Sequence, residues 1–418
     1  MKKVRFNTLR GMRDILPQEI HLWQYIEEKV RKIFEIYNFK EIRPPILEAA
    51  ELFLRSIGED TDIVEKEMYI FHDKKGRTVA LRPEATASVV RAYIEHRLFN
   101  NPPPQRFYYI GPMFRYERPQ KGRFRQFHQA GVEVFGIAEP LIEAELLYMV
   151  KRLFEDMNIR DLTYEINSIG CLNCRAEFKQ LLLDYLENKV LKLCSDCQRR
   201  FQRNPLRVLD CKVESCKNSL SDAPLILDFL CDECEAHFEE FKTLLKEFDI
   251  DFIINPKIVR GLDYYTKTVF EITTPSLGAQ SAVVAGGRYD NLVESFGGPK
   301  TPAVGFAIGM ERLIEIFKDF SFIKPKYPTV YVAYATEELR KDAINLARFF
   351  RDSEISAEAV YENTSLKSQL RKADRFNAYW VIIVGPEEMK RSSYRWKNMR
   401  NGLEGEATLE EIVKLIKK

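Results

Sequence analysis

The sequence lacks several features that would assign it to a common protein class. The chain of 418 residues has no apolar run long enough to span a membrane. Its first residues, MKKVRFNTLRGM, lack the apolar core of a signal peptide. Neither a P-loop nor a GxGxxG fingerprint occurs, so nothing indicates a P-loop ATPase or a dinucleotide-dependent dehydrogenase. We therefore expect a cytoplasmic protein built on neither of these nucleotide-binding motifs.

The chain also has little net charge. Its 64 basic and 62 acidic residues leave a net charge of +2, so any RNA-binding surface must be a local patch. Hydrophobic residues make up 45% and charged residues 30%, which is typical of a folded globular protein. The length allows about two to three domains with full cores.

The most informative stretch is YIGPMFRYERPQKGRFRQFHQAGVEVFG, residues 109–136. We predict two strands, Phe107–Phe114 and Gln126–Phe135, joined by a long cationic loop where hairpins usually have a short turn. Alternate side chains of the second strand share one face, which carries Phe127, Gln129, Gly131, Glu133 and Phe135. Such a mixed face beside a basic loop indicates a ligand site. A solvated edge hairpin is the alternative, which spacing alone leaves open.

The residues of this hairpin resemble a known family. FRYERPQ followed by FHQAGVEVFG resembles motif 2 of the class II aminoacyl-tRNA synthetases, in the form that histidyl-tRNA synthetases carry. Further segments are similar to the same family: KEIRPPILEAAELF (motif 1), LRPEAT, RGLDYY, LGAQSAVVAGGRYDNLVESFGG and AVGFAIGMERLIEIF (motif 3). The resemblance covers nearly the whole chain and is weakest in a cysteine-rich part.

Each of these motifs also has an ordinary structural interpretation. An acidic residue such as Glu84 in a first helical turn favours the helix dipole, and the family usually has Gly where this chain has Ala85. Arg260 beside two tyrosines is also typical of an aromatic-packed ion pair. Arg312 at a helix start suits a phosphate, although a surface salt bridge is the common case.

The resemblance implies a histidine site. Arg260 would activate the histidine carboxylate in place of a metal, and Glu133 and Tyr265 would pair with the imidazole. Three further side chains would hold the α-amino group: Glu84, Thr86 and Gln129. The full expected set is Glu84, Thr86, Gln129, Glu133, Arg260, Tyr264, Tyr265 and Tyr289.

The resemblance likewise implies an ATP site, with Arg115 and Arg260 as the catalytic residues. Arg115 would hold the α-phosphate. The remaining expected contacts are Arg123 and Arg312 on the distal phosphates, Phe127 stacked on adenine and Glu117 near its amino group. Mg²⁺ would bridge the phosphates, bound mainly through the nucleotide and water. Arg118 and Gln120 would meet the tRNA acceptor end.

All eight cysteines lie between residues 171 and 234. They form four pairs in sequence: Cys171 and Cys174, Cys194 and Cys197, Cys211 and Cys216, Cys231 and Cys234. Paired cysteines in a cytosolic protein more often bind metal than form disulfides, and four thiolates make one tetrahedral zinc site. Eight could hold two structural Zn²⁺ ions. Disulfides, as in intracellular proteins of hyperthermophiles, and inert thiols are the alternatives.

A linker marked by two prolines, SFIKPKYPTVYV (residues 321–332), separates a second region with a different order of predicted elements. Strands and helices then alternate, which predicts a small α/β domain similar to the anticodon-binding domain of this family. KRSSYRWKNMR, residues 390–400, sets five basic residues among Tyr394 and Trp396. This composition suits phosphates and stacked loop bases, or else a solvated strand pair.

The resemblance implies an α+β catalytic domain with the mostly antiparallel sheet of class II synthetases, a cysteine-rich insertion and a C-terminal α/β anticodon-binding domain. We predict these domains at 1–170 with 245–322, at 171–244 and at 328–418. The implied activity is ATP-dependent ligation of L-histidine to histidine tRNA through histidyl-adenylate, by a homodimer. Two alternatives are a histidine-binding regulatory subunit of ATP phosphoribosyltransferase and a non-catalytic tRNA-sensing module. Both should have lost the ATP-site arginines, which this chain keeps.

Overall fold

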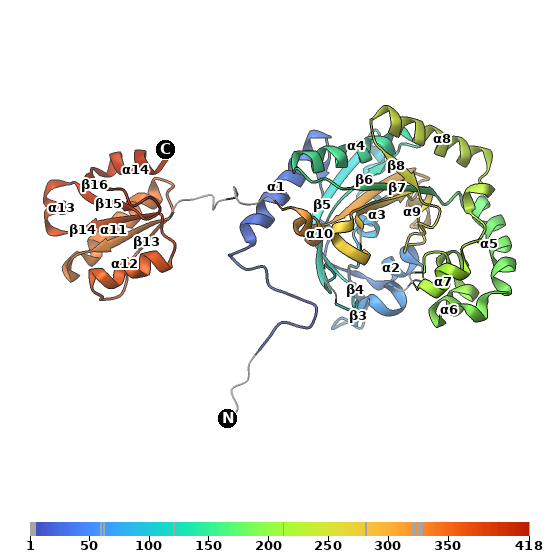
Figure 1. The fold of residues 1–418 in the computed structure, drawn as a ribbon, viewed down its shortest axis with the longest axis horizontal. Helices are drawn as coiled ribbons and strands as arrows, with labels where there is room; N and C mark the ends of the chain where they lie inside the picture. Colours follow the sequence, from blue (N-terminus) through green and yellow to red (C-terminus); the bar gives the residue numbers. More distant parts are fainter. Residues whose placement is uncertain are drawn as a thin grey trace, which may run out of the picture. The chain divides into compact units, whose positions relative to one another are not determined.

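A computed structural model describes residues 6–58, 61, 63–119, 122–211, 213–280, 282–318, 323 and 329–417. The chain divides into two compact units, Met1–Phe322 and Ile323–Lys418 (Figure 1). Among the described residues, no helix is both long enough and apolar enough to cross a membrane.

A large sheet of eight strands forms the centre of the first unit. In spatial order its strands are β1 (Lys40–Glu41), β5 (Gln105–Phe114), β6 (Gln126–Phe135), β11 (Ala303–Gly309), β10 (Ala282–Arg288), β9 (Thr266–Thr273), β7 (Thr163–Ser168) and β8 (Phe252–Ile254). The two outermost pairs are parallel and the other five pairs are antiparallel. The predicted mostly antiparallel sheet is therefore confirmed. The predicted hairpin is β5 and β6, with β5 beginning two residues before Phe107.

The second half of β6 explains how the sheet shapes a site. Residues Ala130 to Phe135 are all buried, and β6 pairs with β5 on one side and with β11 on the other. A strand buried on both faces should be apolar throughout. Glu133 departs from that rule, which marks it as a residue kept for another reason.

Among the described residues of the first unit, a second, three-stranded sheet and six helices lie outside the cysteine-rich segment. The sheet has the order β2 (Leu47–Ala49), β4 (Thr78–Leu81), β3 (Tyr69–His72). The helices are α1 (Ile20–Ile36), α2 (Ala50–Ile57), α3 (Thr86–Glu95), α4 (Leu141–Asp156), α9 (Leu292–Ser295) and α10 (Met310–Ile316). Helix α1 buries apolar side chains that recur at helical spacing: Trp23, Ile26, Val30, Ile33 and Phe34.

The cysteine-rich insertion separates β7 from β8 in the sequence. Its helices are α5 (Leu172–Glu187), α6 (Ser195–Arg203), α7 (Glu214–Ser219) and α8 (Asp232–Glu247). A small core forms there around Phe178, Leu182 and Val208, together with several cysteines. Short helical turns lie at Ile63–Glu67, Leu98–Asn100, Val190–Lys192, Pro205–Val208, Ile226–Phe229, Pro275–Gln280 and Glu337–Leu339.

The second unit has its own sheet, as the alternating pattern predicts. Its strands are β13 (Ala357–Ala359), β12 (Val330–Tyr334), β14 (Trp380–Val384), β15 (Tyr394–Asn398) and β16 (Glu404–Ala407), in that spatial order. Its helices are α11 (Arg340–Asp352), α12 (Leu366–Arg375), α13 (Pro386–Arg391) and α14 (Leu409–Lys417). Of the predicted linker, residues 321–322 and 324–328 lie outside the described residues. Tyr394 is buried in the core of this unit, so it is not available for base stacking.

Candidate active site

A cavity of about 380 Å³ lies against the large sheet in the first unit. Every side chain expected to bind histidine or ATP lines it: Glu84, Thr86, Arg115, Glu117, Arg123, Phe127, Gln129, Glu133, Arg260, Tyr264, Tyr265, Tyr289 and Arg312. Of the two residues expected at the tRNA acceptor end, Arg118 is exposed and does not line this cavity, and Gln120 lies outside the described residues. Segments that are distant in sequence therefore converge on one hollow.

One end of the cavity is organised around the Glu133 carboxylate. Thr86 Oγ1 donates to its Oε1 at 2.7 Å, and the Tyr289 hydroxyl donates to its Oε2 at 2.5 Å. Burial raises the pKa of Glu133 to about 8. Gly305 stands opposite Glu133 in β11, where a Cβ atom would lie 2.0 Å from Glu133 Oε2. Only glycine leaves room for the carboxylate at this point.

Glu84 and Gln129 supply further oxygen atoms at this end. The Glu84 carboxylate accepts from the backbone N–H groups of Thr86 and Ala87 at 2.5 and 3.0 Å, and so caps the first turn of α3. Its pKa is raised by burial. Within the described part of the chain, Gln129 Oε1 is buried and has no hydrogen-bond partner. A buried unpaired acceptor is costly, and a ligand donor would satisfy it.

Arg260 and two tyrosines form another part of the cavity wall. The Arg260 guanidinium pairs with Glu271 of β9 and lies 5.5 Å from the centre of the Tyr265 ring. Its Nε atom is buried without a hydrogen-bond partner among the described residues. Tyr264 packs against Tyr265, with ring centres 4.7 Å apart. This arrangement leaves part of the guanidinium ready to bind an anion.

Three more arginines gather at the hairpin end of the cavity. Arg115 donates through Nε to the Pro83 carbonyl at 2.9 Å, and its guanidinium lies 5.3 Å from the centre of the Phe127 ring. Arg123 pairs with Glu117, and Arg312 Nη1 donates to the Ala282 carbonyl at 2.5 Å. Burial first, and the charge of Arg123 second, lower the pKa of Arg312. A polyanion bound here would relieve that repulsion.

Sequence reasoning missed several residues of this site. Glu271 faces Arg260 from β9, and the alternation of side chains along this strand was the available signal. Glu311 accepts from the His128 backbone N–H at 2.9 Å and so joins α10 to β6. Tyr109 also lines the cavity and is buried. Nothing in the sequence alone distinguishes Tyr109 from a core tyrosine.

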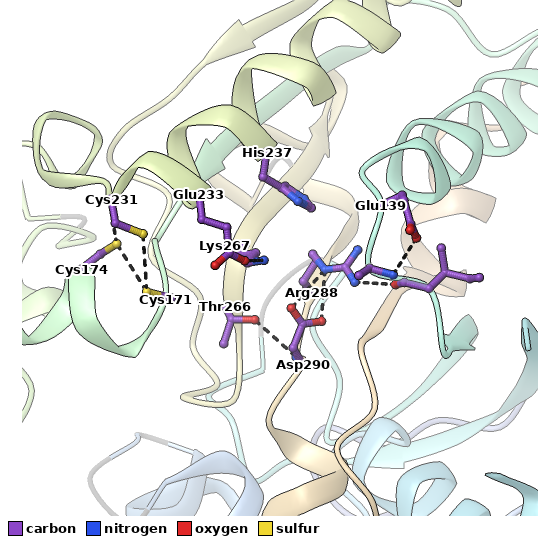
Figure 2. Close-up of polar contacts among 12 residues, drawn as sticks. Glu139, Cys171, Cys174, Cys231, Glu233, His237, Thr266, Lys267, Arg288 and Asp290 are labelled. Carbon is purple, nitrogen blue, oxygen red and sulfur yellow. Dashed lines mark hydrogen bonds and ion pairs between the residues drawn. The ribbon is translucent and has the colours of Figure 1, made fainter.

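A buried ionic network includes Arg288 and Asp290, the two chain neighbours of Tyr289. Arg288 donates from Nη1 to Glu143 at 2.8 Å and from Nε to Asp290 at 3.1 Å. His237 of α8 donates from Nε2 to the same Glu143 carboxylate at 2.9 Å. Figure 2 shows His237 projecting from α8 toward Arg288 and Asp290. The insertion helix α8 therefore contacts the catalytic part through this network.

Among the residues that the structure describes, two groups could hold a metal ion, and both lie in the insertion. One group is Cys171, Cys174, Cys231 and Cys234, and the other is Cys194, Cys197, Cys211 and Cys216. All eight cysteines are free thiols.

Both units of the chain match known protein families. Residues 11–313 match the family described as histidyl-tRNA synthetase, and residues 329–418 match the anticodon binding domain. A histidine–tRNA ligase from Thermodesulfovibrio yellowstonii is 64% identical over 415 residues, which cover 99% of each chain. The apo histidyl-tRNA synthetase of S. aureus superposes with a TM-score of 0.82 at 35% identity, covering 99% of this chain and 100% of that one.

The fold alone is shared more widely. A structure titled ATP phosphoribosyltransferase regulatory subunit/histidyl-tRNA synthetase, from Bacillus halodurans C, has a TM-score of 0.65 at 20% identity and covers 92% of this chain and 99% of its own. The sequence relationship, by contrast, is close and extends over both units. The chain belongs to the histidyl-tRNA synthetase family.

Proposed function

We propose that this protein joins L-histidine to histidine tRNA at the expense of ATP. In the first step the histidine carboxylate attacks the α-phosphate, forms histidyl-adenylate and displaces pyrophosphate. In the second step the histidyl group passes to the terminal ribose of the tRNA and AMP leaves. The observation that carries the proposal is a single cavity with two ends, one of carboxylate and hydroxyl groups and one of arginines.

The amino-acid end is suited to histidine. Glu133 and Tyr265 would pair with the two imidazole nitrogens, and Glu84, Thr86 and Gln129 would hold the ammonium group. A site that hydrogen-bonds both nitrogens rejects isosteres lacking them by several orders of magnitude. The unpaired Gln129 Oε1 supports this assignment, because an ammonium donor would satisfy it.

The arginine end is suited to ATP. Arg260 would hold the histidine carboxylate and the α-phosphate, and Arg115 the α-phosphate. Arg123 and Arg312 would take the distal phosphates, with Phe127 stacked on adenine and Glu117 near its amino group. The carboxylate nucleophile is already ionised, so the barrier lies in bringing two anions together and in stabilising charge on phosphorus. This explains why the expected catalytic groups are arginines and why no general base is needed.

The family as a whole uses ATP with Mg²⁺, and we propose that Mg²⁺ bridges the phosphates here, bound mainly through the nucleotide and water. Arg118 and Gln120 would meet the acceptor end of the tRNA, and the second unit would bind the anticodon. We also propose the domain limits 1–170 with 245–322, 171–244 and 328–418, and structural Zn²⁺ in the insertion. A cytoplasmic location follows from a role in translation, and cell fractionation would test it.

We further propose a homodimer. Four large apolar side chains on or beside the three-stranded sheet are exposed by 42 to 45%: Ile46, Leu47, Ile70 and Phe71. Leu47 and Phe71 share one face of this sheet, because Leu47 and Tyr69 both pair with Leu81 of β4 and Phe71 follows Tyr69 by two residues. Exposed apolar side chains on one face are typical of an interaction surface. Phe71→Glu should convert the dimer to a monomer in sedimentation analysis. A variant that still sediments as a dimer would assign the interface elsewhere.

Histidine-dependent ATP–pyrophosphate exchange, without tRNA, tests the function. We expect exchange that requires histidine and ignores the other amino acids. Histidine binding without exchange would favour the regulatory subunit of ATP phosphoribosyltransferase. Absence of both binding and exchange would favour a tRNA-sensing module. The retention of Arg115, Arg123 and Arg312 in the cavity argues against these two alternatives.

A further inference from the structure

The eight cysteines of the insertion pair in space differently from their order in the chain. The first pair in the chain lies close to the last pair, and the two middle pairs lie close to each other. We name these groups the outer site (Cys171, Cys174, Cys231, Cys234) and the inner site (Cys194, Cys197, Cys211, Cys216). Within each site the four Sγ atoms lie within 4.8 Å of one another. The two sites are therefore nested, with the inner one enclosed by the chain between the halves of the outer one.

The sulfur–sulfur distances fit a single tetrahedral ion. Cys171 Sγ lies 3.6 Å from Cys174 Sγ and 4.0 Å from Cys231 Sγ, and Cys194 Sγ lies 3.9 Å from Cys211 Sγ. Zinc–thiolate bonds of about 2.3 Å in a regular tetrahedron set neighbouring sulfurs ~3.8 Å apart. A disulfide requires about 2.0 Å. An iron–sulfur cluster divides its four thiolates among two or four iron atoms, which sets some of the sulfurs farther apart than the ligands of one ion.

The backbone around each site favours thiolates over thiols. Cys171, Cys194 and Cys231 are the N-cap residues of α5, α6 and α8, so their sulfurs lie near free N–H groups. In the outer site the Cys231 N–H donates to Cys174 Sγ at 3.2 Å, and in the inner site the Cys194 N–H donates to Cys216 Sγ at 3.1 Å. Donors at both sites stabilise the negative charge that a metal ligand must carry.

The inner site lies within the small hydrophobic core of the insertion. Cys197 and Cys216 are completely buried and Cys211 nearly so, beside a small set of apolar side chains. A core of this size is typical of small domains that need a metal or disulfides for stability. Four thiolates around one ion supply that stabilisation at the centre of α6, α7 and the turn at Pro205–Val208.

The outer site lies where the insertion leaves β7 and where α8 begins, and Figure 2 shows its cysteines close to Glu233 and Lys267. Just before Cys171, the backbones of Ile169 and Gly170 bond to Lys267 of β9, at 2.8 and 2.9 Å. Just after Cys231, Glu233 of α8 pairs with the Lys267 side chain at 2.7 Å. Farther along α8, His237 reaches the Glu143–Arg288 network next to Tyr289. An ion in the outer site would therefore fasten both ends of the insertion to one strand.

We propose that the protein binds two structural Zn²⁺ ions, one in the outer site and one in the inner site, and that the outer ion fixes the base of the insertion on β9. Neither ion contacts the cavity proposed for histidine and ATP. The inference goes beyond the ligase activity. An inactive protein with two zinc ions would overturn the proposed function alone, and an active protein without zinc would overturn this inference alone.

The metal content of serine variants tests the nested pairing. The full-length protein should contain two zinc ions per chain by mass spectrometry of the metal. Cys171→Ser and Cys194→Ser should each lose one. The double variant C171S/C231S should also lose only one, because both residues belong to the outer site, whereas C171S/C194S should lose both. Pairing in chain order would give the reverse result for the two double variants and would overturn the proposal.

A measurement on the unmodified protein avoids variants that fail to fold. Titration with a mercurial reagent, followed by a zinc-sensitive dye, should release two zinc ions as eight thiols react. Replacement of zinc by Co²⁺ should give the charge-transfer absorption of tetrahedral thiolate coordination at both sites. One zinc ion per chain, iron in place of zinc, or disulfides in the protein purified without reductant would each overturn the proposal.

Discussion

The cavity and the cysteine-rich insertion differ in whether their buried polar atoms have partners. In the cavity, Gln129 Oε1 and Arg260 Nε are buried without partners among the described residues, and Arg312 sits near the like charge of Arg123. In the insertion, each thiol faces three other thiols and two of them also accept backbone N–H groups. A site that binds and releases substrates keeps polar atoms unsatisfied. A site that holds a fold together satisfies them permanently.

The largest effect is expected from Arg260→Ala. Removal of the guanidinium that would bridge carboxylate and α-phosphate should reduce the histidine-dependent exchange rate by at least ~10³-fold. The melting temperature should stay close to that of the wild type. Arg43→Ala, which removes an arginine whose side chain is 76% exposed, is the matched control and should leave exchange unchanged. Exchange near the wild-type rate in Arg260→Ala would remove this residue from the mechanism.

The network that joins the two regions should give the next largest effect, on stability. Arg288→Ala leaves Glu143 buried with its main cation removed, which should lower the free energy of unfolding by about 3–5 kcal/mol in urea titrations. The double variant R288M/E143M removes both charges and should lose much less. If both variants were equally destabilised, the cost would lie in packing and not in an unpaired charge.

The two metal sites should differ in what they do to the cavity. Cys171→Ser with Cys174→Ser loosens the base of α8, and hence His237, so it should raise the KM for histidine several-fold with a smaller change in kcat. Cys194→Ser with Cys197→Ser disrupts only the inner site and should leave both constants of the exchange reaction close to wild type. Steady-state exchange kinetics measure both variants. Equal effects would mean that the outer site has no special connection to the cavity.

The smallest effect is a change in the pH dependence of stability. The pKa of Glu133 is about 8 in the folded protein, against an ordinary value of 4.5, because the carboxyl is buried. The folded state therefore binds more protons than the unfolded state between these values, and this group's contribution to stability is lost as the pH rises through about 8.

The Glu133→Gln variant carries an amide that does not titrate, so it should not lose stability through this position as the pH rises. Melting temperatures of both proteins at several pH values from 5 to 9 provide the measurement. The melting temperature of the variant should rise relative to that of the wild type as the pH increases. Parallel curves for the two proteins would contradict the raised pKa.

The sequence was more informative for the cavity than for the insertion, for a physical reason. The hairpin face with Phe127, Gln129 and Glu133 combines residue types that a buried strand otherwise excludes, so each one signals function. The cysteines carry an equally clear chemical signal. Their pairing, however, depends on how Cys171 and Cys231 return to the same strand, and spacing along the chain does not encode that contact. Partners such as Glu271 and His237 also stay hidden, because a single charged residue on a strand or helix resembles a solvated one.

Charging of histidine tRNA by the purified protein tests the central claim most directly. With ATP, Mg²⁺ and labelled histidine, we expect histidine to become attached to the 3′ end of histidine tRNA and not to other tRNAs. The attached label should be released by mild base, as for an aminoacyl ester. Histidine-dependent exchange without any transfer to tRNA, or no reaction with histidine at all, would contradict the assignment.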